Sequence, residues 1–340
     1  MNGRERIMAA FDHREADTVP LTEFGVNEKI WRADGCNSLY EFQQKAGYDL
    51  ISVRIKYNRF YEDETFFRDE WGIGYHDNGE ATPHATVHPV QGPEDMDKLI
   101  LPDPDDPFKF QYLEQLVKDY KGEKAICFST RAFFLWASEI MGMDKLLENM
   151  ALEPEFIEDL FDKIVDNQIA VAKNAIKMGA EFIVDTDDYG SNIGPIISPS
   201  MFEEFCADRI IRMADAVHEA GGKFIKHSDG NINKLLDQIV DCHIDALHSI
   251  DPTAHMNLAE VKQKYGDRIT LFGNIDCGNL LTYGTVEDVE NAVKEAIKVA
   301  GPGGGYVVAS SNTIPQTAKP ENVWAIINAA RKYGKYPIEL

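Results

Sequence analysis

Long hydrophobic runs are absent from this sequence of 340 residues. No stretch approaches the roughly 18 uninterrupted apolar residues that a transmembrane helix requires. The first residues also lack the apolar core of a signal peptide, because Arg4, Glu5 and Arg6 place charges there. We therefore expect no membrane span, no secretory signal and a cytoplasmic location.

Cysteine is scarce and follows no motif. The chain has five cysteines, an odd number, and no Cys-x-x-Cys pair occurs among them. They are Cys36, Cys127, Cys206, Cys242 and Cys277. This spacing argues against a disulfide framework and for a reducing compartment, in agreement with a cytoplasmic protein.

Basic residues are also few relative to acidic ones. Lysine and arginine total 34 against 57 aspartate and glutamate residues, which gives a formal net charge of -23. Such an acidic surface repels the phosphates of nucleic acids and the head groups of anionic lipids. We therefore exclude nucleic acid and membrane surfaces as partners, whereas a partner protein that carries a basic patch would be attracted.

What the chain does contain is an alternation of short apolar runs and long helical patterns, clear from Tyr120 onward. The runs predicted as strands are 19–24, 50–56, 124–129, 181–185, 223–227, 245–250, 269–274 and 306–310. This alternation predicts an α/β fold in which eight units close a (β/α)8 TIM barrel. A doubly wound open sheet is the rival architecture, but no Gly-x-Gly-x-x-Gly follows any predicted strand.

Helical patterns fill the intervals between the later strands. They occupy 154–178, 199–220, 232–240, 257–265, 286–300 and 321–333. The segment 58–104 interrupts the rhythm, and its many Asp, Glu, Gly and His residues indicate a small insertion with a β-hairpin formed by 66–76 and 86–89. The whole chain, 1–340, is expected to be a single domain that contains this insertion.

Polar residues follow many of the predicted strands. In a (β/α)8 barrel, the carboxyl ends of the strands and the loops after them form the active site. The polar residues at these positions are Glu23, Arg54, 185–189, 227–231, His248, 274–276 and 310–312. Several of them meeting at one rim predict a site, although a buried histidine that donates to a carbonyl would explain His248 equally well.

Two carboxylates and a histidine at this rim suggest a metal site. Asp188 follows a predicted strand, and His227 ends the next one. Glu203 lies in the second turn of a helix that Ser198 caps and Pro199 begins. Such ligands suit Zn²⁺ with a fourth position left open, as in catalytic zinc sites. The alternative is that these carboxylates only cap helices or pair with surface arginines.

Four segments of the chain resemble the uroporphyrinogen decarboxylase superfamily. They are 4–20, 187–205, 226–232 and 303–323; the third reads Lys-His-Ser-Asp-Gly-Asn-Ile. The likeness spans nearly the whole chain and implies a (β/α)8 barrel. The superfamily contains decarboxylases and zinc methyltransferases that serve corrinoid proteins, so the resemblance implies an enzyme.

The chain departs from the decarboxylases at two places. Their Arg-Gln-Ala-Gly-Arg-Tyr segment, whose arginines bind the substrate's carboxylates, is replaced by 21–27, where Glu23 would repel that substrate. Their late histidine is replaced by Asn312. We therefore do not expect this chain to decarboxylate uroporphyrinogen, and a lyase that acts on a smaller acid is kept as an alternative.

The chain also departs from the methyltransferases that act on methanethiol-type acceptors. Those proteins hold zinc by His-x-Cys and a late Cys, where this sequence has Asp229 and Asn312. Oxygen and imidazole ligands suit an oxygen substrate better than a thiol. The chain is most similar to the methyltransferase component of O-demethylase systems, which moves methyl from a methoxylated aromatic to the cobalt of a corrinoid protein.

This resemblance implies roles for particular residues. Zn²⁺ would be held by Asp188, Glu203 and His227, and Asp187 and Asp229 would be catalytic residues or substitute ligands. The residues expected to bind the aryl methyl ether are Phe24, Tyr189, Asn274 and Asn312.

The corrinoid (cobalamin) is expected to arrive on a partner protein. The cobalamin-binding pattern Asp-x-His-x-x-Gly is absent, and its nearest approach, Asp241-Cys242-His243, has Ala246 in place of the glycine. A homodimer is also compatible with these features. The alternatives are transfer of methyl from methylcobalamin to tetrahydrofolate or a thiol, and a binding protein without catalysis.

Overall fold

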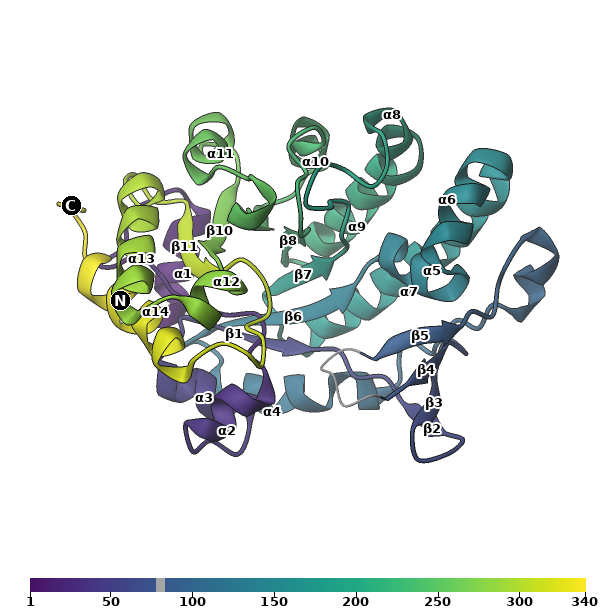
Figure 1. Cartoon of the computed structure of the whole chain (residues 1–340), viewed down its shortest axis with the longest axis horizontal. Helices are drawn as coiled ribbons and strands as arrows, with labels where there is room; N and C mark the ends of the chain where they lie inside the picture. Colours follow the sequence, from purple (N-terminus) through teal and green to yellow (C-terminus); the bar gives the residue numbers. More distant parts are fainter. Residues whose placement is uncertain (78–82) are drawn as a thin grey trace.

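The structure is a computed structural model that describes residues 1–77 and 83–340. In these residues, seven parallel strands form the main sheet, in the order β1-β6-β7-β8-β9-β10-β11 (Figure 1). Their bounds are β1 (Leu50–Arg54), β6 (Ala125–Arg131), β7 (Phe182–Thr186), β8 (Lys223–His227), β9 (Ala246–Ser249), β10 (Thr270–Ile275) and β11 (Tyr306–Ser310). Each strand of this sheet pairs with the next one in the chain, as the alternation predicts, and the α/β class is confirmed.

Helices fill the connections between these strands. The longer ones are α1 (Gly3–Phe11), α3 (Leu39–Ala46), α4 (Gln111–Tyr120), α5 (Phe133–Met141), α6 (Met143–Leu152), α7 (Pro154–Met178), α9 (Asp208–Glu219), α11 (Leu258–Tyr265), α13 (Val286–Ala300) and α14 (Pro320–Tyr333). The bounds of α7 and α13 coincide with the predicted 154–178 and 286–300. Apolar residues at helical spacing and Pro at the first turn of α7 account for this agreement.

Short helical turns complete the crossovers. They are α2 (Glu28–Ala33), η1 (Pro93–Lys98), η2 (Pro107–Phe110), α8 (Pro199–Phe202), the π-helical turn η3 (Glu203–Ala207), α10 (Leu236–Asp241), η4 (Pro252–Ala254) and α12 (Asn279–Tyr283). The helix predicted at 199–220 is therefore divided into α8, η3 and α9. The predicted N-cap is confirmed, because the Ser198 side chain accepts a hydrogen bond from the Met201 N–H.

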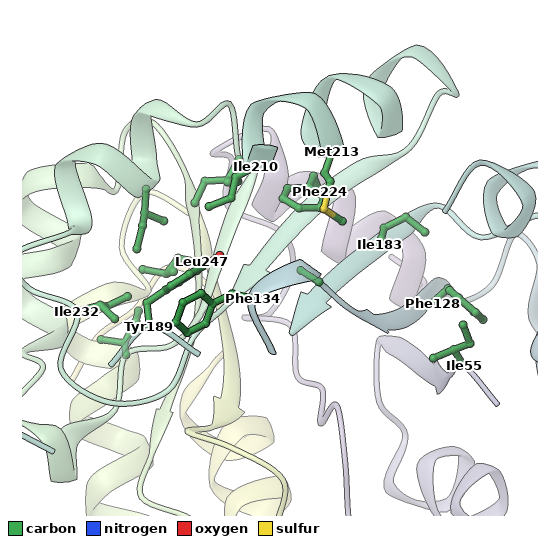
Figure 2. Packing of buried hydrophobic residues seen from close by; sticks show 14 of the residues in the cluster. Ile55, Phe128, Phe134, Ile183, Tyr189, Ile210, Met213, Phe224, Ile232 and Leu247 are labelled. Carbon is green, nitrogen blue, oxygen red and sulfur yellow. The ribbon is translucent and has the colours of Figure 1, made fainter. Parts of the chain in front are cut away.

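Strand register decides which side chains share a face of the main sheet, because neighbours along a strand point to opposite faces. Leu50 and Ile225 lie on what we call the inner face, in a cluster with residues of α1. The opposite, outer face carries Ile183, Phe224 and Leu247, which belong to the larger core that includes residues of the surrounding helices (Figure 2). Both faces are buried, which explains why the strands are near-continuous apolar runs.

The predicted strand 19–24 does not form. Leu21 makes one isolated parallel bridge with Val308 of β11, and its carbonyl accepts a hydrogen bond from the Asp49 N–H beside β1 (2.8 Å). The Leu21 N–H donates instead to the Asp49 carboxylate (3.0 Å), and Pro20 has no N–H to donate. The expectation of an eighth strand is therefore wrong here, although the segment bonds to residues at both edges of the sheet.

A second sheet lies within the interval 58–104. Its four described strands are antiparallel, in the order β2-β3-β4-β5, with bounds β2 (Arg59–Tyr61), β3 (Phe66–Asp69), β4 (Gly74–His76) and β5 (His84–Val87). The predicted hairpin is thus part of a larger sheet, and part of its connection lies outside the described residues. Figure 1 places this sheet at the right of the molecule and both termini at the left.

Within residues 1–77 and 83–340, no helix is both long enough and apolar enough to span a membrane.

Candidate metal site at the carboxyl end of the sheet

Three neighbouring strands bring the candidate site together. Thr186 at the end of β7 pairs in register with His227 at the end of β8, and His227 pairs with His248 of β9. Asp188 and Asp229 each follow the end of their strand by two residues. Parallel strands end at the same edge of a sheet, so the loops after β7 and β8 carry both carboxylates to the imidazole of His227.

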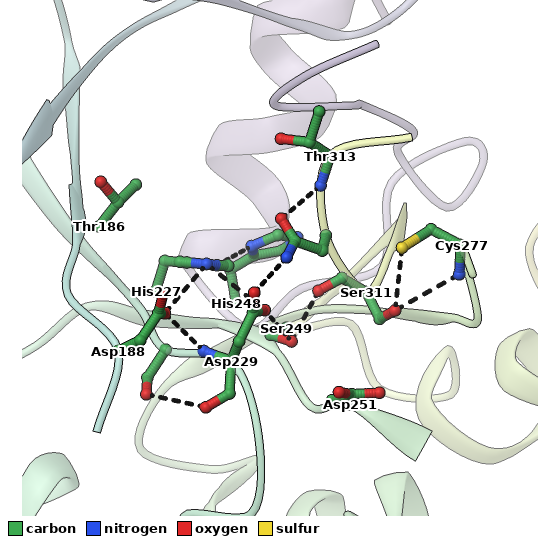
Figure 3. Close-up of polar contacts among 12 residues, drawn as sticks. Thr186, Asp188, His227, Asp229, His248, Ser249, Asp251, Cys277, Ser311 and Thr313 are labelled. Carbon is green, nitrogen blue, oxygen red and sulfur yellow. Dashed lines mark hydrogen bonds and ion pairs between the residues drawn. The ribbon is translucent and has the colours of Figure 1, made fainter. Parts of the chain in front are cut away.

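Asp188, His227 and Asp229 form a compact group of possible metal ligands (Figure 3). One ligand atom from each residue lies within 4.8 Å of the others. The Nε2 atom of His227 is 3.6 Å from Asp188 Oδ1 and 3.5 Å from Asp229 Oδ1. Ligands of a tetrahedral Zn²⁺, each about 2.0–2.2 Å from the ion, lie about 3.4 Å from one another. The spacing therefore fits zinc.

A hydrogen-bonded pair of histidines fixes the orientation of His227. His248 Nε2 lies 3.0 Å from the Ser310 carbonyl oxygen, which can only accept, so His248 Nε2 carries a proton. Burial lowers the pKa of His248 well below its usual value, so this imidazole is neutral and its Nδ1 is an acceptor. His227 Nδ1, 2.6 Å away, must then be the donor. This assignment turns His227 Nε2 toward the two carboxylates.

Further hydrogen bonds hold the two carboxylates in place. Asp188 Oδ1 accepts from the Asp229 N–H (2.8 Å), and Asp229 Oδ1 accepts from the Ser249 hydroxyl (3.0 Å). The Asn312 amide donates to the other Asp229 oxygen. Burial raises the pKa of Asp229 to about 6, and the nearby charge of Asp188 also raises it. Two carboxylates held this close together favour a cation between them.

Glu23 is connected to this network through Ser310, and its carboxyl group is uncharged at neutral pH. Only 2% of it is exposed; it accepts from the Ser310 N–H (2.9 Å) and shares a hydrogen bond with the Ser310 hydroxyl. Burial raises the pKa of Glu23 to about 8, so the carboxyl group is protonated at neutral pH. A protonated Glu23 carries no charge to repel an anionic substrate, so the missing arginine segment is the stronger argument against the porphyrinogen substrate.

Three of the predicted site residues lie outside the group. The Glu203 carboxylate accepts from the Gln238 amide (2.9 Å), on the side of α10. Asp187 is fully buried and accepts from the N–H groups of Phe134 (3.1 Å) and Leu135 (2.5 Å) at the start of α5. The Tyr189 hydroxyl donates to Asp187 (2.8 Å), in the core. These contacts hold the side chains of Glu203, Asp187 and Tyr189 outside the group of Asp188, His227 and Asp229.

The other three predicted residues divide between the site and a separate cavity. Asn312 contacts Asp229, as described above, and the half-buried Phe24 ring lies edge-on to His248, 4.6 Å between ring centres. Asn274 lines a cavity of about 560 Å³ together with residues of α11 and α13. The structure therefore places Asn312 against the candidate ligand group, Phe24 beside His248, and Asn274 in the wall of this cavity.

Sequence reasoning missed the contribution of His248 and Ser249. The expected bond from a buried His248 to a carbonyl is present, but the same ring also contacts His227, which no spacing along the chain reveals. A signal existed nonetheless. Strands 223–227 and 245–250 are consecutive and parallel, and each carries a histidine within two residues of its carboxyl end, so pairing the two strands would have predicted the histidines as neighbours.

Comparison with known proteins assigns the chain to a family. The model of the uroporphyrinogen decarboxylase family matches residues 65–333, most of the chain. The chain therefore belongs to the uroporphyrinogen decarboxylase family. It is 28% identical over 280 residues to the uroporphyrinogen decarboxylase of Aliivibrio salmonicida (strain LFI1238), covering 78% of this chain and 76% of that protein. The corresponding protein of Aeromonas salmonicida (strain A449) is 26% identical over 276 residues, 78% and 75% of the two chains.

Solved structures share the fold. A methyltransferase from Methanosarcina mazei aligns with a TM-score of 0.80 and 19% identity over 98% of this chain and 99% of that protein. A B12-independent methionine synthase from Shewanella sp. W3-18-1 aligns with a TM-score of 0.51 and 11% identity over 93% and 98%. At these identities the likeness establishes the fold alone.

Proposed function

We propose that this protein is a zinc-dependent methyltransferase that moves the methyl group of an aryl methyl ether to the cobalt of a corrinoid protein. The observation that carries the proposal is the donor set of Asp188, His227 and Asp229, with the His227 Nε2 atom 3.5–3.6 Å from both carboxylates. Carboxylate and imidazole ligands suit activation of an ether oxygen, whereas thiolate ligands suit a thiol. The similarity in fold to a protein named as a methyltransferase agrees with it.

Asp188, His227 and Asp229 would hold the ion, with Asp229 in the role first expected of Glu203. Zn²⁺ at this position supplies Lewis-acid stabilisation of the charge that develops on the ether oxygen when the phenolate leaves. His248 keeps the proton of His227 on Nδ1, and so leaves Nε2 free for the metal. Ser249 and Asn312 orient the Asp229 carboxylate.

The substrate is expected to lie on the inner face, beside His248. Phe24, whose ring is half-buried against His248, offers an aromatic surface to the ring of the methyl donor. The methyl group must then point toward solvent. The cobalt(I) nucleophile arrives on a partner protein and attacks the methyl carbon along the line of the breaking bond. The acidic surface of this chain would favour the approach of that partner.

A reconstitution of three components tests the proposal. A panel of methoxyarenes is mixed with this protein and a reduced corrinoid protein, and phenol and methylcobalt are measured. We expect both products in equal amounts, only when all components are present, and more slowly as salt is added. Phenol formed without the corrinoid protein, or no methylcobalt with any methoxyarene, would contradict the proposal.

A second assay covers the alternatives within the same scaffold. Methylcobalamin is supplied with tetrahydrofolate or with a thiol, and a set of small aromatic acids is tested for release of carbon dioxide. Activity in one of these assays, without activity on methoxyarenes, would favour the reverse methyl transfer or a lyase, as in the relatives named uroporphyrinogen decarboxylase.

A further inference from the structure

Arg54 has no counter-ion among residues 1–77 and 83–340. It is the last residue of β1, its side chain is exposed, and among the described residues it has no hydrogen bond or ion pair. This is unexpected in a chain with 57 acidic against 34 basic residues. Other arginines form ion pairs with carboxylates: Arg6 pairs with Asp17, and Arg131 pairs with Glu139 (2.5 Å).

Strand register places Arg54 on the inner face, at the edge that carries the candidate metal site. Arg54 is four residues from Leu50, so both side chains point to the inner face. Arg54 pairs with Ser129 of β6, and Arg131, two residues further, shares this face. Arg131 lies in register with Thr186, and Thr186 with His227. Strands are spaced by about 4.8 Å, so the backbones of Arg131 and His227 are about 10 Å apart.

Arg54 and Arg131 form a positive patch, and the single carboxylate of Glu139 does not neutralise both charges. Desolvation lowers the pKa of Arg54, and the charge of Arg131 lowers it further. The side chain is thus close to surrounding protein and still open to solvent, as expected of a residue that lines the approach to a site. Arg131 is held by Glu139 and by the Trp136 ring, 5.1 Å below its guanidinium. Arg54 is therefore the group available to a ligand.

We propose that Arg54, with Arg131 beside it, binds the carboxylate of the methyl donor, so that the substrate is a methoxylated aromatic acid rather than a neutral ether. The proposal rests on the proposed function. Guanidinium groups bind carboxylates through two parallel hydrogen bonds, which fixes orientation as well as charge. A rigid aromatic ring would span from this carboxylate to the methoxy group at the Asp188, His227 and Asp229 group.

Calorimetric titration of the full-length protein tests this site without any turnover. The ligands are 4-methoxybenzoate, benzoate and the neutral 4-methoxybenzamide; the variants are Arg54→Gln, Arg54→Lys and the control Arg14→Gln. Arg14 is an exposed arginine outside the site, paired with Asp12. We expect Arg54→Gln to raise the Kd of both benzoates by about 10- to 100-fold, the range for a lost charged hydrogen bond. Arg54→Lys should have an intermediate effect, and Arg14→Gln none.

The outcomes separate this proposal from the proposed function. Equal affinities of wild type and Arg54→Gln for benzoate would overturn the carboxylate site, whatever the methyl-transfer assay shows. Loss of benzoate binding in Arg54→Gln would support it even if no methoxyarene is demethylated. A weaker affinity of Arg54→Gln for free hydroxocobalamin, with benzoate unaffected, would assign the anion to the corrinoid phosphate and overturn it too. Thermal unfolding shows whether Arg54→Gln is folded; if it is not, Arg54→Lys decides by the same comparison.

Discussion

His227 and His248 are joined by a hydrogen bond between their Nδ1 atoms, 2.6 Å apart, and their rings are stacked with centres 4.8 Å apart. The carbonyl of Ser310 fixes the proton of His248, and His248 in turn fixes the proton of His227. This relay orients His227 Nε2, the nitrogen proposed to bind the metal, through two residues outside the proposed ligand set. Such supporting contacts commonly change metal affinity when they are removed.

Replacement of His248 should therefore weaken metal binding without removing a ligand. We expect His248→Leu to lower zinc affinity by about 10- to 100-fold, measured by competition with a chromogenic chelator. His248→Gln should retain more affinity, because its amide oxygen can accept from His227 and its NH₂ can donate to Ser310. Equal affinities of His248→Leu and wild type would refute the relay.

The zinc binding of two variants, Asp229→Asn and Glu203→Gln, shows which of these carboxylates is a ligand. Asp229→Asn should lower zinc affinity by more than about 100-fold, since it removes a charged ligand. Glu203→Gln should leave the zinc content unchanged, because Glu203 contacts Gln238 and not His227. Zinc content is measured on the purified variants. Retention of zinc by Asp229→Asn together with its loss from Glu203→Gln would restore the ligand set first predicted from the sequence.

The buried pair of Lys226 and Asp185 should be essential for stability. Their side chains are fully buried and 2.8 Å apart. Lys226→Met removes the partner of a buried carboxylate and should cost about 3–5 kcal/mol of unfolding free energy, measured by urea denaturation. The double variant Lys226→Met and Asp185→Leu should cost less, because no charge is left unpaired. A single variant as stable as wild type would show that the pair does not contribute.

Glu23 should make stability depend on pH. Burial raises its pKa from 4.5 to about 8, so between these values the folded protein keeps a proton that the unfolded chain has released. Each unit of pH in this window then lowers the unfolding free energy by about 1.4 kcal/mol. Glu23→Gln has no titratable group at this position. The unfolding free energy of Glu23→Gln relative to that of wild type should therefore rise by about 1.4 kcal/mol per pH unit from about pH 5 to pH 8. A constant difference across this range would show that Glu23 does not titrate as described.

The strands of the main sheet were predictable because both of their faces are buried, which leaves apolar runs such as 181–185 and 223–227 in the sequence. The segment 19–24 looked like a strand for the same reason. Its failure depends on Asp49, whose carboxylate takes the Leu21 N–H, and sequence spacing does not reveal such a tertiary contact.

The candidate site was predicted in part for related reasons. Strand ends identified Asp188, His227 and the possible substitute Asp229. Glu203 was predicted from its helical position and from the family resemblance, but its carboxylate contacts Gln238 of α10, a tertiary contact that spacing along the chain does not reveal. The description of the chain as one domain with an insertion at 58–104 stays a prediction.

X-ray absorption spectroscopy at the zinc edge tests the central claim most directly, because it reports the donor atoms around the metal. The zinc-loaded protein should show only nitrogen and oxygen neighbours, at about 2.0–2.2 Å. His227→Ala should lose the metal or the imidazole signature. A sulfur neighbour at about 2.3 Å would place zinc on cysteine, and so outside this site. That result, or the absence of any zinc binding by the wild-type protein, would contradict the account.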